Sequence, residues 1–455
     1  MRKRIILTTL VVLLSMGIAW GTNPGDAVDI ESLSLNQVCD YAVQHSINTA
    51  NARLDVAMAR KKIWETTATG LPQLNASVSY NNNLDIPTTL VPAQIFDPDA
   101  EPGTFLALKF GTQHNASLDI TATQLIFSGS YIVALQASKV YLQFSQNSLE
   151  KSEIDTRATV SGTYYLILLA EDSKKTLEAS LENLKKTLFE TEEMHKAGFV
   201  EDTDVDQLQL SVTDLENSIK SMDRQIRITY RLLKFQMGMD LDKEIRLSDS
   251  LDTVFAQIDS GKLLTEPLDL ESHIDYRILE TQVKSQKLLL KRQISEYLPT
   301  ISAFATHQQN AMRDSFNFFK KSDDQWFPTT VVGLNISIPI FSSGMRAAQV
   351  AQLKMELKKA KNSQKQVADG LRLELMQARS AFEDAVEKKE STQKNVRLAE
   401  KIYEKTRVKY REGISSSLEL TQIHNQYLTA HSNYLSAMVE LLNAKTRMDK
   451  ILSKL

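Results

Sequence analysis

The side chains best suited to chemistry show none of the spacings that active sites or metal centres require. The seven histidines include no H-E-x-x-H pair, there is no G-x-S-x-G turn, and "DSGKLL" lacks the upstream glycine of a phosphate-binding loop. His307 and His424 fit better as surface residues of a strand and a helix than as metal ligands. We therefore expect no enzyme activity, no catalytic residue, no bound metal and no cofactor.

Two carboxylates, Asp204 and Glu419, occupy equivalent places in two similar stretches. The stretches are "HKAGFVEDTDVDQLQLSVT" at 195–213 and "YREGISSSLELTQIHNQYL" at 410–428. In each, a glycine holds the fourth place (Gly198, Gly413) and the acidic residue follows six places later. A glycine between two helical runs supplies the positive φ that lets the chain reverse, so both are predicted to be hairpin turns. Taken alone, each carboxylate fits a solvated charge or a helix start, where the helix dipole favours negative charge.

Long helices must position these two turns. The ten prolines leave one gap from Gly103 to Glu266 and another after Pro339, and both gaps are rich in Leu, Ala, Glu, Lys and Gln. The segment from Ser342 to Lys409 could form roughly 100 Å of helix at about 1.5 Å per residue, continuous or in stacked pieces. No ordinary globular core needs helices that long.

Apolar or small residues recur at alternating steps of three and four after each turn, as in a coiled coil. After the first turn they are Val205, Leu208, Val212, Leu215, Ile219, Met222, Ile226, Thr229 and Leu233. After the second they are Leu420, Ile423, Tyr427, Ala430, Tyr434, Ala437, Leu441, Ala444, Met448, Ile451 and Leu455. Adding 215 to any number in the first series gives a number in the second, as with Val205 and Leu420. The sequence is therefore repeated in register.

Four short segments with a period of two lie between the helical runs, at about 72–83, 114–127, 299–310 and 329–341. In the second, Leu118 and Ile120 alternate with Asp119 and Thr121, which predicts a strand with one apolar and one polar face. Such strands suit the wall of a membrane barrel, although a soluble hairpin has the same pattern. Loops rich in Pro, Asn and Asp, at 84–113 and 311–328, would join them. Four strands cannot close a barrel that leaves a pore, so several copies would have to share one.

The first residues have the pattern of a secretory signal peptide. Three basic residues at 2–4 precede an apolar run at 5–20, and small residues offer a cleavage site after Gly21. An uncleaved membrane anchor is the alternative, but the apolar run is short. Cleavage takes the formal net charge from −3 to −6, which argues against binding nucleic acid. Cys39, the only cysteine, lies too far along the chain for lipid attachment and is expected to be a small buried side chain.

The two halves share further segments in the same order. "GLPQLNASVSYNNN" pairs with "YLPTISAFATHQQN", and "QLIFSGSYIVALQASK" pairs with "IPIFSSGMRAAQVAQLK". The landmarks at their junctions of strand and helix are Pro72, Pro299, Phe127, Phe341, Gly129 and Gly344. With these segments in this order twice over, the chain resembles the TolC-like outer-membrane efflux proteins, the outer membrane factor family. The resemblance covers the chain from about Ser34 to Leu455.

The resemblance implies a mainly α fold with a small β part. Each subunit of a homotrimer would add four membrane β-strands to a shared 12-stranded barrel, which the helices would continue as a long coiled-coil α-helical barrel. It also implies an export duct without chemistry, in the outer membrane of a Gram-negative bacterium and extending into the periplasm. Its partners would be a periplasmic adaptor (membrane fusion) protein, an inner-membrane transporter of RND or ABC type, and outer-membrane lipid. The alternative is a periplasmic coiled-coil adaptor or a structural protein of a secretion system.

Four segments make up the expected organisation of the chain. They are a signal peptide at 1–21, a first structural repeat at 22–239, a connection at 240–270 that lies partly in an equatorial belt, and a second structural repeat at 271–455.

The resemblance also implies a pore gate and an adaptor-docking site at the two turns. Glu419, Asp204 and Tyr410 match gate positions, and the turns at Gly198 and Gly413 match the docking site. Tyr410 would donate a hydrogen bond across to the first turn, with Asp204 as the acceptor.

Two other positions depart from the family pattern. Ser415 replaces a basic latch residue and Gln422 replaces a second acidic residue. Glu419 from three subunits would form a ring of carboxylates that attracts cations and raises its own pKa.

Overall fold

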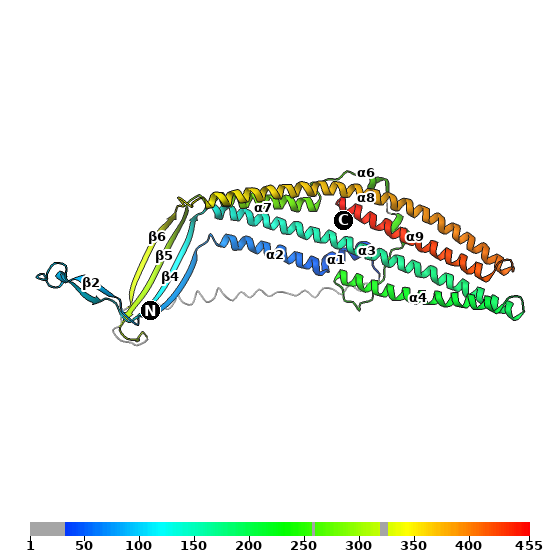
Figure 1. Cartoon of the computed structure of the whole chain (residues 1–455), viewed down its shortest axis with the longest axis horizontal. Helices are drawn as coiled ribbons and strands as arrows, with labels where there is room; N and C mark the ends of the chain where they lie inside the picture. Colours follow the sequence, from blue (N-terminus) through cyan, green and yellow to red (C-terminus); the bar gives the residue numbers. More distant parts are fainter. Residues whose placement is uncertain (1–31, 257–259, 319–325) are drawn as a thin grey trace, which may run out of the picture.

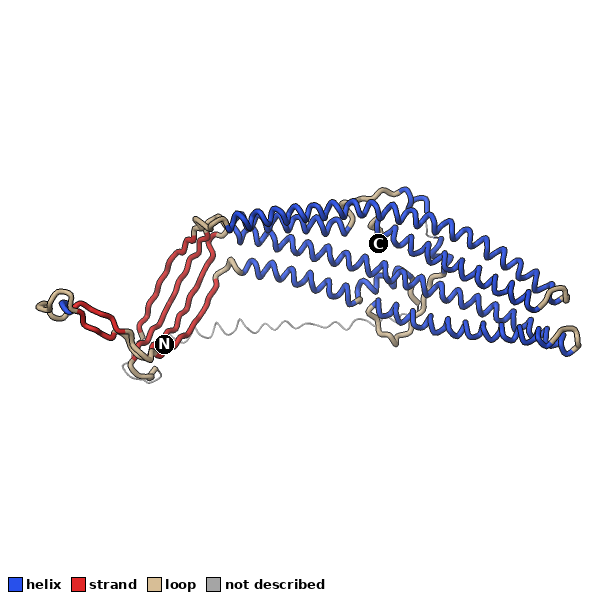
Figure 2. Tube along the Cα trace, viewed as in Figure 1, coloured by secondary structure: helices blue, strands red, loops and turns tan. Residues whose placement is uncertain are grey.

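The computed structural model describes residues 32–256, 260–318 and 326–455, so the predicted signal peptide at 1–21 lies outside the described residues. The molecule is long, with four strands at one end and the turns of two helical hairpins at the other (Figure 1). Helices make up most of its length, as Figure 2 shows. No helix in the described ranges is long and apolar enough to cross a membrane.

The elements follow one another in a similar order in both halves of the chain. The first half has α1 (Leu35–His45), α2 (Ile47–Ala68), β1 (Gln73–Asn82), β2 (Thr88–Pro92), the 3-10 turn η2 (Ala93–Ile95), β3 (Phe105–Lys109), β4 (His114–Phe127), α3 (Gly129–Lys196) and α4 (Asp202–Met237). Two short helices, α5 (Leu251–Ala256) and α6 (Ser260–Thr265), lie in the connection. The second half has α7 (Ile274–Ser295), β5 (Thr300–Arg313), β6 (Phe327–Ser337), α8 (Met345–Arg411) and α9 (Ser417–Ile451).

The four long strands form one antiparallel sheet in the order β1-β4-β5-β6. Its rows keep the two predicted faces apart, because antiparallel partners point to the same side. One row consists of Leu74, Ala122, Ala305 and Val332, and a row on the opposite face consists of Ser77, Asp119, Gln308 and Thr329. The apolar face is bare: Val332, for example, is 78% exposed.

Two details of the strands differ from the sequence expectation. The predicted loop at 84–113 contains β2 and β3, which pair as a hairpin that projects beyond the sheet in Figure 1. The last predicted strand ends at Ser337 rather than at 341, because Pro339 has no N–H to donate to a neighbouring strand.

The predicted landmarks lie where the sheet joins the helices. Pro72 and Pro299 directly precede β1 and β5, and Phe127 ends β4. Gly129 begins α3 at a close contact with the end of α7, since a side chain there would lie 3.0 Å from Ser295 Cβ. In the second half, Phe341 follows β6 as an exposed side chain, and Gly344, at φ +82°, is the N-cap of α8.

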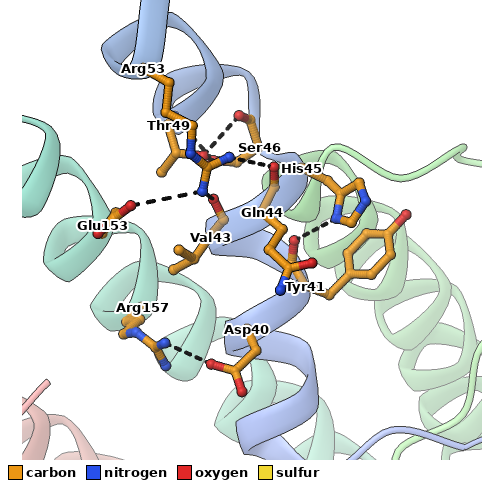
Figure 3. Close-up of polar contacts among 10 residues, drawn as sticks. All are labelled: Asp40, Tyr41, Val43, Gln44, His45, Ser46, Thr49, Arg53, Glu153 and Arg157. Atoms are coloured by element: carbon orange, nitrogen blue, oxygen red, sulfur yellow. Dashed lines mark hydrogen bonds and ion pairs between the residues drawn. The ribbon is translucent and has the colours of Figure 1, made fainter. Parts of the chain in front are cut away.

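The junction of α1 and α2 is held by side chains that cap both helices (Figure 3). Ser46 ends α1 and caps α2 by accepting a hydrogen bond from the backbone N of Thr49. Arg53 donates to the carbonyl oxygens of Val43 and Gln44, both at 2.7 Å, and so satisfies the end of α1. An ion pair from Arg157 to Asp40 ties α1 to α3. These contacts let the chain change direction between two short helices.

A buried core at mid-length joins the connection to the helices. It includes Cys39 of α1, which is buried as predicted and lies 3.4 Å from the hydroxyl of Ser161 on α3. Tyr164 donates to Asp249 of the connection at 2.9 Å, and burial raises the pKa of Tyr164. The connection is therefore packed against α3 rather than hanging free.

Candidate functional site

The two hairpin turns have nearly the same backbone. Gly198 and Gly413 have φ values of +80° and +71°. In each turn the next N–H bonds back to a carbonyl five residues earlier: Phe199 to Met194 at 2.9 Å, and Ile414 to Lys409 at 2.8 Å. This is the bonding of a helix that ends in a left-handed glycine. We name the pair α3 and α4 the first hairpin and the pair α8 and α9 the second hairpin.

Glu419 lies exposed in the first turn of α9. Its backbone N donates to the Ser416 hydroxyl, which caps α9, and its carboxylate accepts a hydrogen bond from Ser415 at 2.7 Å. The residue that replaces the expected basic latch thus binds the predicted gate carboxylate within the same turn. Because Ser415 is neutral, it leaves the negative charge of Glu419 in place.

Tyr410 is buried between the hairpins, but its predicted acceptor is wrong. Its hydroxyl lies 2.9 Å from the hydroxyl of Thr191 on α3 and bonds there, not to Asp204. Burial raises the pKa of Tyr410. The tyrosine still connects the second hairpin to the first, because Thr191 lies on α3, in the second-last turn of the helix.

Asp204 also connects the hairpins, through a different partner. The buried hydroxyl of Ser417, at the start of α9, donates to the half-buried carboxylate of Asp204 on α4. Charge-assisted bonds join α8 to α3 nearby, from Arg411 to Glu190 at 2.9 Å and from Arg407 to Asn183 at 3.1 Å. The tips of the hairpins are thus linked by polar bonds, and a cavity of about 350 Å³ lies beside Tyr410.

His424 is buried, which contradicts its assignment to a helix surface. Its ring lies between α9 and α3, with Nε2 2.5 Å from the hydroxyl of Ser180. Desolvation lowers the pKa of His424 to about 4, so the ring is neutral near pH 7. His307, by contrast, lies exposed on β5 beside Thr330, as predicted for a strand surface.

The burial of His424 could have been predicted from a second series of residues on α9, next to the seam that begins at Leu420. A second series on α9, again at steps of three and four, is buried or half-buried and turns toward α3. It consists of Thr421, His424, Leu428, His431, Leu435, Met438 and Leu442. Because α9 packs against both α8 and α3, it needs two such series.

No group of three or more His, Cys, Asp or Glu residues in the described part of the chain could hold a metal ion. A cavity of about 1050 Å³ lies at mid-length on α4 and the connection and is lined by basic residues such as Arg224 and Arg231. It is far along α4 from the turns. The candidate site is therefore the set of side chains between the two hairpins.

The sequence matches the model of a family described as "Outer membrane efflux protein" over residues 39–238 and 283–454. No curated protein matches the chain.

Several solved structures share the fold over nearly the whole chain. CusC is 15% identical, with 95% of each chain covered and a TM-score of 0.70. The open state of the MtrE outer membrane channel of Neisseria gonorrhoeae is 16% identical over 93% of this chain and 91% of that chain, with a TM-score of 0.70. The outer membrane protein VceC of Vibrio cholerae is 14% identical over 92% of this chain and 95% of that chain, with a TM-score of 0.68.

Proposed function

Because this chain belongs to the outer membrane efflux protein family, we propose that it is the export duct of a tripartite system. As a homotrimer in the outer membrane of a Gram-negative bacterium, it carries substrates out of the cell. It receives them from an inner-membrane transporter of RND or ABC type through a periplasmic adaptor (membrane fusion) protein. The duct itself has no enzyme activity.

The sheet is the observation that carries this proposal. Its outer strands, β1 and β6, each pair on one side only within the described chain. Four strands are too few to enclose a pore, and an unpaired strand edge seeks another strand. Three copies joined from β6 to β1 form a closed barrel of 12 strands.

The two faces of the sheet suit that barrel. The apolar face, with side chains such as Leu74, Val78 and Val332 more than 70% exposed, lies against outer-membrane lipid. The polar face carries hydrogen-bonded pairs, such as Ser79 with Ser117 and Thr121 with Thr306, and lines the water-filled interior. A soluble protein has little reason to expose so large an apolar face.

The helices continue the barrel as a tunnel. The strands β1, β4, β5 and β6 lead into α2, α3, α7 and α8, which are neighbours in the same order. In the half of the molecule nearer the hairpin turns, α4 packs against α3 and α9 packs against α8. We infer two structural repeats, at 22–239 and 271–455, with the connection at 240–270 contributing to an equatorial belt and a signal peptide at 1–21 that is cleaved on export.

The hairpin ends form the gated periplasmic mouth. Asp204 and Tyr410 hold the second hairpin to the first in the closed arrangement, and Glu419 contributes a ring of three carboxylates to the pore. The turns at Gly198 and Gly413 are the docking points for the adaptor, because their glycines have open space around them and leave the backbone accessible.

Cell fractionation and channel recording test this function. The protein should fractionate with the outer membrane as a trimer that dissociates on heating, and it should form cation-selective channels in a planar bilayer. A soluble monomer in the periplasm would instead support the alternative of a coiled-coil adaptor.

The gate has its own test. Glu419→Gln should weaken block of the channel by divalent cations applied on the side of the turns, by at least severalfold, because it removes three charges from the ring. Glu412→Gln, which neutralises another exposed acid of the same turn, is the matched control and should change the block much less. Equal effects of the two variants would remove Glu419 from the gate.

A further inference from the structure

Four aromatic rings of the second hairpin contact one another in series, farther from the turns than Tyr410. Tyr403 of α8 lies over His424 of α9 with ring centroids 5.0 Å apart, and Tyr403 stacks on Tyr427 at 5.7 Å. Tyr427 in turn contacts His431 at 6.3 Å. Two of the four rings are therefore imidazoles, which can change charge where the tyrosines do not.

Both histidines reach across to hydroxyl groups of the first hairpin. His424 contacts Ser180, and Nε2 of His431 lies 3.2 Å from the hydroxyl of Thr176. Ser180 and Thr176 are about one helical turn apart on α3, whereas the two histidines are about two turns apart on α9. The histidines thus connect the two hairpins, because each ring contacts a tyrosine of the second hairpin and a hydroxyl group of the first.

The boundary between the two hairpins is the weaker of the two kinds of helix contact. Within each hairpin the shorter helix packs along the half of the longer helix that is nearer the turn, α4 against α3 and α9 against α8. Between the hairpins the contact is less extensive and includes many polar bonds. Separation of intact hairpins therefore costs less than unwinding either one, and it exposes both histidines to water.

We propose that His424, assisted by His431, is an acid-sensitive lock of the duct. Neutral rings hold the second hairpin against the first, and protonation on the side of the turns drives the hairpins apart and opens the mouth. This lock rests on the proposed function as a gated duct and adds a regulator to it.

The surroundings of His424 explain why acid acts on it. A protonated ring could still donate to Ser180, so the penalty comes from burying a charge and not from losing a bond. Among the residues that the structure describes, no charged group offsets that penalty, because burial alone accounts for the lowered pKa of His424. From α8, Arg407 and Glu404 act on the neighbouring Tyr403 and already form an ion pair with each other at 2.7 Å. From α4 the facing side chains of this cluster are apolar, among them Leu208.

His431 responds more weakly, because charges compensate part of its burial. Its pKa is lowered by desolvation, but Asp172 of α3 and Glu400 of α8 act in the opposite direction. Protonation of the buried His431 ring therefore costs less free energy than protonation of the buried His424 ring. We assign it the smaller share of the acid response.

The direction of the response follows from the two states of His424. With the hairpins together the pKa is about 4, and with the ring in water it is close to 6.5. The stabilisation of the closed state by His424 is therefore complete above pH 6.5 and decreases as the pH falls from 6.5 toward 4. At pH 5 the ratio of open to closed should rise roughly thirtyfold per subunit.

Single-channel recording in a planar bilayer tests the lock, with the pH on the side of the turns lowered from about 7.5 to 5. The wild-type open probability should rise steeply below pH 6.5. His424→Gln, which cannot titrate but still carries a hydrogen-bonding amide, should abolish most of the rise. His195→Gln is the matched control, because it removes an exposed histidine at the end of α3 whose ring bonds to the carbonyl oxygen of Val200. It should respond to acid as the wild type does.

A second variant separates the titrating ring from its bond. Ser180→Ala keeps His424 and should open more often at neutral pH while retaining the response to acid. A channel that conducts but shows no rise below pH 6.5, or a His424→Gln channel that responds like the wild type, would overturn the lock alone. Absence of any channel from the wild-type protein would instead overturn the proposed function.

Discussion

The two hairpin turns have the same backbone conformation but different side-chain contacts. Gly198 and Gly413 end their helices with the same left-handed conformation and the same pattern of backbone bonds. Three residues before each glycine, however, His195 is exposed whereas Tyr410 is buried and reaches Thr191. The two turns therefore share a backbone conformation, but the side chains around them differ, and those of the second hairpin bind the first.

Truncation of the residue before each turn should separate the two hairpins most clearly. Tyr410→Ala removes a buried aromatic ring and should destabilise the tip of the second hairpin by about 3 kcal/mol or more, whereas His195→Ala should cost less than about 0.5 kcal/mol. Amide hydrogen exchange in the last turns of α3 and α8 measures both local opening energies. Similar losses for the two variants would mean that the turns are equivalent after all.

Loss of the bond between Ser417 and Asp204 should have the next largest effect. Ser417→Ala leaves a half-buried carboxylate without its donor and should destabilise the contact of the hairpins by about 2 kcal/mol. The equivalent residue of the first hairpin is Asp202, which is exposed, and Asp202→Ala should change little. Channel recordings should show a higher open probability for the first variant only, and the reverse order would contradict the assignment.

Substitution of the two glycines tests whether the two turns depend equally on a left-handed backbone conformation. Gly198→Ala and Gly413→Ala each place a side chain at a positive φ and should each cost about 1–2 kcal/mol, since neither site has a neighbour within 4 Å that could add to the strain. Equal losses, measured by hydrogen exchange at the two tips, would confirm that the backbones are interchangeable. A loss at only one turn would show that its conformation depends on side chains nearby.

The smallest difference should come from the helix caps. Ser416 caps α9 through its side chain, whereas Glu201 at the start of α4 makes no such bond. Ser416→Ala should therefore destabilise the start of α9 by about 1 kcal/mol, and Glu201→Ala should have almost no effect on α4. Exchange rates of the first amides of the two helices report this directly, and an equal cost at Glu201 would contradict the difference between the caps.

Much of the fold was predictable because its helices and strands repeat at regular intervals. The seams from Val205 and Leu420 and the alternation around Leu118 predicted the helices after each turn and the long strands. The hairpin of β2 and β3 was missed because each strand has only five residues among prolines and glycines, too few for a period of two to stand out.

The site was less predictable, because it depends on how two hairpins meet. A single helical seam places His424 on the surface, and only the contact of α9 with a second helix buries it. The partner of Tyr410 likewise depends on the relative height of α8 and α3, which puts Thr191 rather than Asp204 beside its hydroxyl. Neither the helix that buries His424 nor the partner of Tyr410 can be predicted from the spacing of residues within one hairpin.

The pairing of β4 with β5 has a consequence for the order of folding. Thr121 and Thr306, which face each other in the middle of the sheet, are 185 residues apart along the chain. Bringing them together costs about 5 kcal/mol of loop-closure entropy, whereas each helical hairpin closes around a turn of a few residues. High contact order slows folding, so we expect the hairpins to form first and the sheet last. A newly made chain would then keep its apolar strands apart until its helices have already brought them to the same end of the molecule.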